Sequence, residues 1–329
     1  MRLVRRFIRR TSTRRTVALV AIAGAATALG AAGLSALDAC VPADTRPVPG
    51  SLLLTVSPSP AVTQGVTTVD GWNVTFERLV VNMGQASLGG SCNSYSEADY
   101  TRVLDVTSQP GQKLSILYGI GQCDLRFRVA PPTVDAVLGE NVSQADVDTL
   151  RTPGGDAYVP LGGISIDLAG AAVRGAVTKH FHLLFRPRVR YGNCRLEEDA
   201  GPGVDLVSSG ALTYDIRMEG EAVLRDDVDA ATASLRFDPF ANADKDGDGN
   251  VTLDELRQVP IGDVRDGGAF EAGTYVFDDD AGIFRQGRAI PITTFGDYVY
   301  ELLLPTLPRF RDTGNCTVGI GRGGGGGPG

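Results

Sequence analysis

The stretch WNVTFERLVV, residues 72–81, alternates apolar and polar side chains. Trp72, Val74 and Phe76 are separated by single polar residues. Successive side chains of a β-strand point to opposite faces of a sheet, so this period of two predicts a strand with one buried face.

The same alternation recurs along the chain, interrupted by Gly and Pro at intervals typical of turns. The further runs are CDLRFRV (123–129), ISIDLAGAAVRGAV (164–177), KHFHLLFRPRVRY (179–191) and ALTYDIRMEGEAVL (211–224). We therefore expect a mainly β fold, an antiparallel β-sandwich of the immunoglobulin-like or prealbumin-like kind, with its body over residues 61–236.

Few helices are expected. Residues 144–150 follow Ser143, a favourable N-cap, and form a short amphipathic segment. Thr294 would cap a C-terminal helix that ends at Pro305. Its apolar stripe consists of Phe295, Tyr298, Val299 and Leu302.

The segment DKDGDGNVTLDE, residues 244–255, carries oxygen-bearing residues at alternate positions of a twelve-residue loop. This spacing suits a hard divalent cation, which takes six to eight oxygen ligands. The expected calcium ligands are Asp244, Asp246, Asp248, Asn250, Thr252 and Glu255. Gly249 stands sixth in the loop, where the chain must turn through a positive φ.

The residues around this loop complete the pattern. Thr252 and Glu255 form a capping-box sequence for an exit helix, and Asp238 with Pro239 begins a short entering helix. The segment resembles an EF-hand calcium loop, and we expect residues 237–318 to hold it and the helical C-terminal part. No second loop of this spacing is evident, which is typical of weak, structural extracellular sites.

Residues 1–39 read as an export signal: seven arginines precede a weakly hydrophobic Ala/Gly-rich run. Arg14 and Arg15 resemble a twin-arginine (Tat) motif, with the Sec route as the alternative. Leu37 and Ala39 before Cys40 resemble a lipobox, from which Asp38 departs. We expect Cys40 to be acylated; an uncleaved membrane anchor is the alternative. Residues 40–60 would then be a tether with a candidate first strand at 52–56, and residues 319–329 a disordered Gly-rich tail.

The five cysteines fit this export prediction. Acylation of Cys40 would leave four, an even number suited to an oxidising compartment. Three connectivities are open, and we favour Cys92 with Cys123 and Cys194 with Cys316, on proximity for the first pair. No CxxC spacing occurs, which argues against thiol redox catalysis and a thiolate zinc site.

The expected mature chain has a net charge of −14, because the signal removes seven arginines and one aspartate from 31 basic and 39 acidic residues. Such a field repels phosphate, and no nucleic-acid partner is expected. The remaining 290 residues are enough for one large or two ordinary domains.

Two further groups of side chains lie on the predicted strands. His180 and His182 lie two apart on one face and would share a zinc or copper ion if a third ligand joined them. Arginines at alternate positions would form an anion-binding patch; the alternative is an exposed face paired with acids. These are Arg126, Arg128, Arg186, Arg188 and Arg190.

The order of VTFERLVVN (74–82), RYGNC (190–194), FDPFANADKDGDGNVTLDEL (237–256) and TGNC (313–316) resembles a poorly characterised group of bacterial surface lipoproteins with a β-rich body and one calcium loop. The resemblance implies a non-enzymatic module, lipid-anchored to the cell envelope through Cys40, that binds an envelope protein or a glycan. No GxSxG or phosphate-binding loop is present. The alternatives are a secreted polysaccharide hydrolase using paired carboxylates, and a copper- or zinc-handling protein.

Overall fold

The structure is a computed structural model that describes residues 46–95, 98–154, 162–196, 203–265, 273–275 and 290–321. The predicted export signal (1–39) and Cys40 lie outside these residues. Within them, no helix is both long and apolar enough to cross a bilayer.

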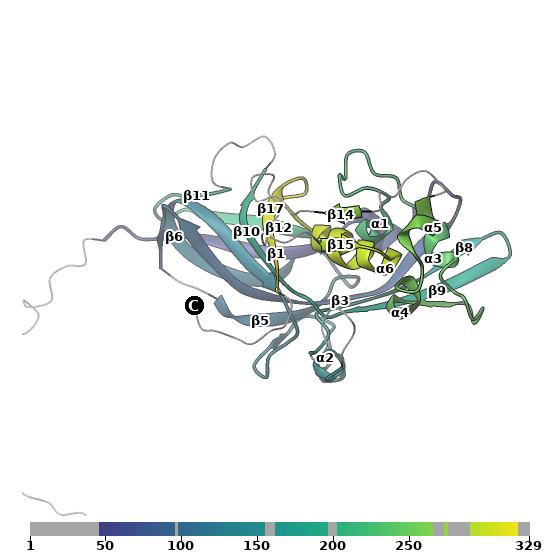
Figure 1. Ribbon diagram of the computed structural model, residues 1–329. Helices are drawn as coiled ribbons and strands as arrows, with labels where there is room; N and C mark the ends of the chain where they lie inside the picture. Colours follow the sequence, from purple (N-terminus) through teal and green to yellow (C-terminus); the bar gives the residue numbers. More distant parts are fainter. Residues whose placement is uncertain are drawn as a thin grey trace, which may run out of the picture. The chain divides into compact units, whose positions relative to one another are not determined.

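The described chain is mainly β, as predicted (Figure 1). The strands are β1 (Gly50–Pro58), β2 (Val66–Thr67), β3 (Asn73–Gly90), β4 (Asn93–Ser94), β5 (Ala98–Asp105), β6 (Gln112–Val129), β7 (Val137–Leu138), β8 (Ile166–Arg174), β9 (Val177–Phe185), β10 (Arg188–Arg195), β11 (Val204–Leu206), β12 (Ala211–Met218), β13 (Asn250–Thr252), β14 (Gly273–Tyr275), β15 (Ile290–Ile292), β16 (Pro308–Phe310) and β17 (Asn315–Gly321).

Helical segments lie between and after the strands. They are α1 (Pro60–Gln64), α2 (Gln144–Arg151), α3 (Asp238–Ala241), α4 (Leu253–Leu256), α5 (Ile261–Arg265) and α6 (Phe295–Asp297), with 3₁₀ turns at Gly220–Leu224 and Leu304–Thr306 and a π-helical segment at Tyr298–Leu303.

Fifteen of the described strands belong to one large sheet, whose main path runs β13-β9-β8-β3-β6-β1-β12-β16. The 18-residue strands β3 and β6 change partners along their length. The first half of β3 pairs with β8 and the second half with β5 and β6; β6 pairs first with β1 and then with β3, β10 and β11. These two strands therefore connect all the other parts of the sheet.

The sheet is mixed, which corrects the expectation of a purely antiparallel arrangement. The parallel pairs are β1 with β12, β5 with β7, and β13 with β9. In each pair a long intervening segment brings the chain back to the same end of the sheet, as a parallel connection requires. Alternation of side chains is the same in both kinds of pair, so the sequence pattern did not distinguish them.

Three predicted segments differ from the structure in their bounds. The first strand expected at 52–56, inside the predicted tether, is present but longer: it forms β1, residues 50–58, which lies inside the sheet between β6 and β12 because Leu52 and Leu54 are fully buried there. Residues 319–321 of the expected tail belong to β17, whose backbone pairs with Arg188, Val189 and Arg190 of β10. Residues 220–224, which continue an alternating run, form a 3₁₀ turn instead of a strand.

The helical predictions are confirmed at their N-termini. Ser143 caps α2 with a capping box to Asp146. Thr294 likewise caps α6 through Asp297, but the chain then becomes π-helical and passes Pro305 in a 3₁₀ turn.

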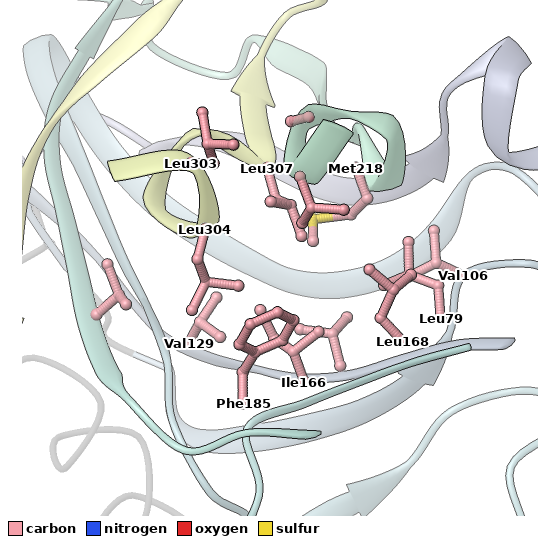
Figure 2. Packing of buried hydrophobic residues seen from close by; sticks show 14 of the residues in the cluster. Leu79, Val106, Val129, Ile166, Leu168, Phe185, Met218, Leu303, Leu304 and Leu307 are labelled. Atoms are coloured by element: carbon pink, nitrogen blue, oxygen red, sulfur yellow. The ribbon is translucent and has the colours of Figure 1, made fainter. Parts of the chain in front are cut away.

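The main core lies between the sheet and this C-terminal helical segment. Figure 2 shows Leu304 and Leu307 pointing toward Ile166 and Phe185 of the sheet, and all four residues are at most 1% exposed. A smaller cluster forms on the opposite face of β3, where Val147 and Leu150 of α2 cover Val80. The central part of β3 is therefore buried on both faces, and the alternation of residues 72–78 stops there.

Both favoured disulfides are present. Cys92 bonds to Cys123 and Cys194 to Cys316. The second bond links β10 to β17, which are 122 residues apart.

Candidate functional site: an acidic loop on the sheet edge

The acidic loop, residues 244–255, is held between two short helices. Its entering helix α3 begins at Asp238, with Pro239 in the first turn. Its exit helix α4 is capped by Thr252 and Glu255, which form the predicted capping box. The sequence therefore correctly predicted where the entering helix begins and how the exit helix is capped.

Three of the six expected ligand residues come together. Carboxylate oxygens of Asp244, Asp246 and Glu255 lie within 4.8 Å of one another. Among the described residues, this is the group of acidic side chains that could hold a metal ion. Asp248 is not in the group; its carboxylate accepts a hydrogen bond from the backbone N–H of Asn250 at 2.7 Å. Such a set of hard oxygen donors suits Ca²⁺ or Mg²⁺ better than a soft metal.

Backbone hydrogen bonds shape the turn around Asp244. Its side chain is fully enclosed, and its carboxylate accepts from the N–H groups of Gly247 at 2.8 Å and Gly249 at 2.9 Å. Gly247 and Gly249 have φ values of 75° and 84°, a conformation that side chains with a Cβ resist. Sequence reasoning identified Gly249 but missed Gly247.

A three-residue strand joins the loop to the sheet. In β13, Asn250, Val251 and Thr252 pair in parallel with residues 180–182 of β9, and the N–H of His180 donates to the carbonyl of Gly249 at 2.8 Å. Val251 is fully buried. The edge strand β9 thus occupies the place where EF-hands usually carry the strand of a second loop.

A lysine from the same edge strand contacts the acidic group. Lys179 of β9 forms an ion pair with Asp244 and donates a hydrogen bond to its Oδ2. This bond, with those from Gly249 and Gly247, lowers the pKa of Asp244 below its usual value. The loop sequence contains no signal for this cation, because Lys179 is 65 residues away.

The entering helix is anchored by residues far away in sequence. Asp70 accepts the backbone N–H groups of Phe237 and Asp238 at 2.8 and 2.7 Å. Asp238 in turn accepts a hydrogen bond from the indole Nε1 of Trp72 at 2.9 Å and pairs with Arg174 at 2.7 Å. The helix that leads into the loop is therefore held against the turn that precedes β3.

An aromatic contact connects the loop to the C-terminal segment. Phe240 of α3 stacks on Phe237 and meets Phe295 of α6 edge-on at 5.0 Å. All three rings are at most 1% exposed. The entering end of the acidic loop is thus attached to packed structure.

The two histidines lie beside this loop without a third metal-type ligand among the described residues. His180 and His182 are exposed and sit opposite Asn250 and Thr252. The Nε2 of His182 lies 2.8 Å from Asp167 Oδ1, and this hydrogen bond raises the pKa of His182. Asp167 is buried and also pairs with Arg78, at 2.6 Å. His182 therefore belongs to an ion-pair network of the sheet.

The structure separates the predicted arginines into two groups. Arg126 and Arg128 of β6 lie beside Arg188 and Arg190 of β10. Arg186 precedes β10, and its guanidinium donates to the carbonyl of Gly162 at 2.7 Å, so it holds a neighbouring loop in place.

A pair of carboxylates, one buried and one half-buried, was missed by sequence reasoning. Glu219 is surrounded by Arg225, Arg217 and Arg309, the last two at 3.6 and 3.5 Å. Glu221 accepts a hydrogen bond from Ser59 at 2.6 Å, and burial raises its pKa. The chain segments that form this group are far apart in sequence, so spacing contains no sign of it.

Comparison with protein-family models, with curated proteins and with solved structures gives no match. The fold and the site are therefore interpreted from their own geometry.

Proposed function

We propose that this chain is an exported calcium-binding surface lipoprotein that acts as a non-enzymatic binding or envelope module. The observation that carries the proposal is the acidic loop itself. Its ligand residues have the spacing of an EF-hand loop, and three of their carboxylates lie close together. Two glycines of the loop have positive φ, and its short strand β13 pairs with the sheet.

The role proposed for calcium is structural. The loop lies between α3 and α4 and attaches through β13 to the edge of the sheet, so an ion in it would hold the helical C-terminal part against β9. In this proposal the loop is of the EF-hand type, and the large sheet folds as a sandwich around the core that Figure 2 shows.

The proposed affinity is weak, with a dissociation constant on the order of 0.1–1 mM. Two features support this. The loop has no second calcium loop as a partner among the described residues, and Lys179 places a positive charge directly against Asp244. Such a site binds calcium in a calcium-rich extracellular medium and is empty in the cytosol. The C-terminal part of the protein would therefore fold completely only after export.

Export and anchoring through an acylated Cys40 are part of the proposal. The two disulfides support an oxidising compartment, because such bonds persist there. The partner proposed for the module is an envelope protein or a glycan.

The test is a calcium titration by calorimetry, together with thermal melting of the full chain with and without calcium. We expect millimolar binding and a rise in Tm that scales with RT ln(1 + [Ca²⁺]/Kd). Glu255→Gln should abolish both effects while keeping an oxygen for the capping box with Thr252.

The matched control is Asp254→Asn, because the Asp254 side chain is 78% exposed and lies outside the cluster. It should bind calcium like the wild-type protein. Equal Tm values with and without millimolar calcium in the wild-type protein would contradict the proposal.

A further inference from the structure

Four arginines form a compact patch on one face of the sheet. We call Arg126, Arg128, Arg188 and Arg190 the guanidinium patch. Arg128 lies directly opposite Arg190 in the antiparallel pair of β6 and β10. Residues two apart on a strand are separated by about 7 Å and neighbouring strands by about 5 Å, so the four side chains emerge close together.

The backing of this patch is rigid. Between the arginines, Phe127 and Tyr191 point to the other face, where their rings stack with centroids 4.7 Å apart. Both rings are buried, as are Val129 and Val189. The apolar residues that alternate with the arginines therefore fix which way the charged side chains point.

No member of the patch forms an ion pair with a carboxylate among the described residues. Like charges directly opposite each other destabilise a sheet. Burial, and after it the charges of Arg190 and Arg188, lower the pKa of Arg128. Arg128 donates a hydrogen bond to Oε1 of Gln85 at 2.9 Å, which leaves its charge unneutralised. A protein with a net charge of −8 has ample acid to neutralise these groups, so their lack of carboxylate partners among the described residues is the observation that calls for a ligand.

The surroundings of the patch are small and polar. Arg128 pairs across to Gly84 of β3, Arg126 to Ser87, and Arg190 to Gly319 of β17. None of the exposed large apolar residues of the described chain lies on β10 or on residues 126–129. Protein-binding surfaces usually contain an apolar or aromatic centre, and this face has none.

We propose that the guanidinium patch binds an acidic oligosaccharide, a short glycan segment whose sugars carry carboxylates. Guanidinium groups bind carboxylates through two parallel hydrogen bonds, and four of them need more than one anionic group. A short segment contacts the patch alone and avoids the acidic remainder of the surface.

The test uses the full chain with both disulfides intact, at low salt and with a calcium chelator. The probe is a galacturonate oligomer, titrated by calorimetry, and its methyl ester is the matched neutral probe. We expect binding of the oligomer only, weakening as salt rises. Arg128→Gln combined with Arg190→Gln should weaken it at least tenfold.

Arg195→Gln is the control, because Arg195 is exposed on the same strand, outside the patch. It should leave the affinity within about twofold. Removing both like charges of the Arg128–Arg190 pair should leave Tm unchanged or raise it, which shows that the double variant folds.

Three results would overturn the proposal. They are no binding of the oligomer, equal binding by the double variant, and equal or tighter binding of a glutamate oligomer of the same charge, of inorganic phosphate or of vesicles containing phosphatidylglycerol. Circular dichroism and a melting curve of the chelated protein establish that it is folded, so none of these results depends on the calcium site.

Discussion

The ammonium group of Lys179 on edge strand β9 donates a hydrogen bond to the carboxylate of Asp244, the first residue of the acidic loop. Positive charge at this point opposes a divalent cation in the loop while holding Asp244 in place. This ion pair therefore fixes the loop to the sheet and is expected to lower its affinity for calcium.

Replacing this lysine should therefore strengthen calcium binding. We expect Lys179→Gln to lower the Kd for calcium by about three- to tenfold, the effect of one charge close to a partly solvated site. Calorimetric titration checks it. Lys245→Gln is the control, because Lys245 is exposed within the loop and its charge is screened by water, so a change below about twofold is expected. Weaker binding by Lys179→Gln would show that Lys179 mainly orders the loop.

Removing Asp70 should destabilise the protein, because its carboxylate accepts two backbone N–H groups at the start of α3. We expect Asp70→Ala to lower the free energy of unfolding by about 1–2 kcal/mol, as for loss of a helix cap. Urea denaturation measures this change. Asp99→Ala, on the exposed side of β5, should cost less than about 0.5 kcal/mol. Equal effects of the two substitutions would remove the anchoring role assigned to Asp70.

The two disulfides should differ in their contributions. They join residues 31 and 122 positions apart, which corresponds to about 4 and about 5 kcal/mol of loop-closure entropy. We therefore expect Cys194→Ser with Cys316→Ser to lower stability more than Cys92→Ser with Cys123→Ser. Denaturation of both double variants without reductant checks the order, and a reversed order would contradict the loop-closure explanation.

Glu221 should make stability depend on pH. Burial raises its pKa in the folded state above the unfolded value, so its contribution is present at low pH and is lost as pH rises through the folded pKa. Nearby Glu219 favours the same neutral form, while Arg225 and the hydrogen bond from Ser59 oppose it. We expect Glu221→Gln to raise Tm at about pH 7 and to leave it unchanged at about pH 4.

Melting curves across this pH range test the sign. Glu140→Gln, an exposed carboxylate, serves as the control and should show no such pH-dependent gain. A destabilised Glu221→Gln at neutral pH would mean that the ionised carboxylate is required by its arginine neighbours.

Much of the fold was predictable because it depends on local periodicity. The alternation around Trp72, Val74 and Phe76 corresponds to the first half of β3, and Ser143 and Thr294 cap helices as expected. The disulfide pairing was favoured before the structure placed the cysteines together. The sequence predictions were wrong where a strand is buried on both faces. They were also wrong where a glycine-rich segment forms a strand by pairing with a neighbour, as in residues 319–321.

In the acidic loop, too, local features were predictable from the sequence and long-range contacts were not. Its spacing, glycine and capping box are contiguous in the chain, so sequence alone located it. Lys179, Asp70 and the edge strand β9 reach it only through folding. The guanidinium patch is similar: alternation indicated that the arginines share faces, but only the register of β6 with β10 placed Arg128 against Arg190 and left Arg186 elsewhere.

The sequence by itself determined the β-rich class of this protein, the N-terminal caps of two helices and the spacing of six oxygen-bearing residues, because these follow from side-chain alternation and contacts within a few residues. Only the tertiary structure decided which strands run parallel, which cation faces Asp244 and which arginines gather without a carboxylate partner. Those outcomes depend on long-range register, which is set by packing the whole core and has no counterpart in any short stretch of sequence.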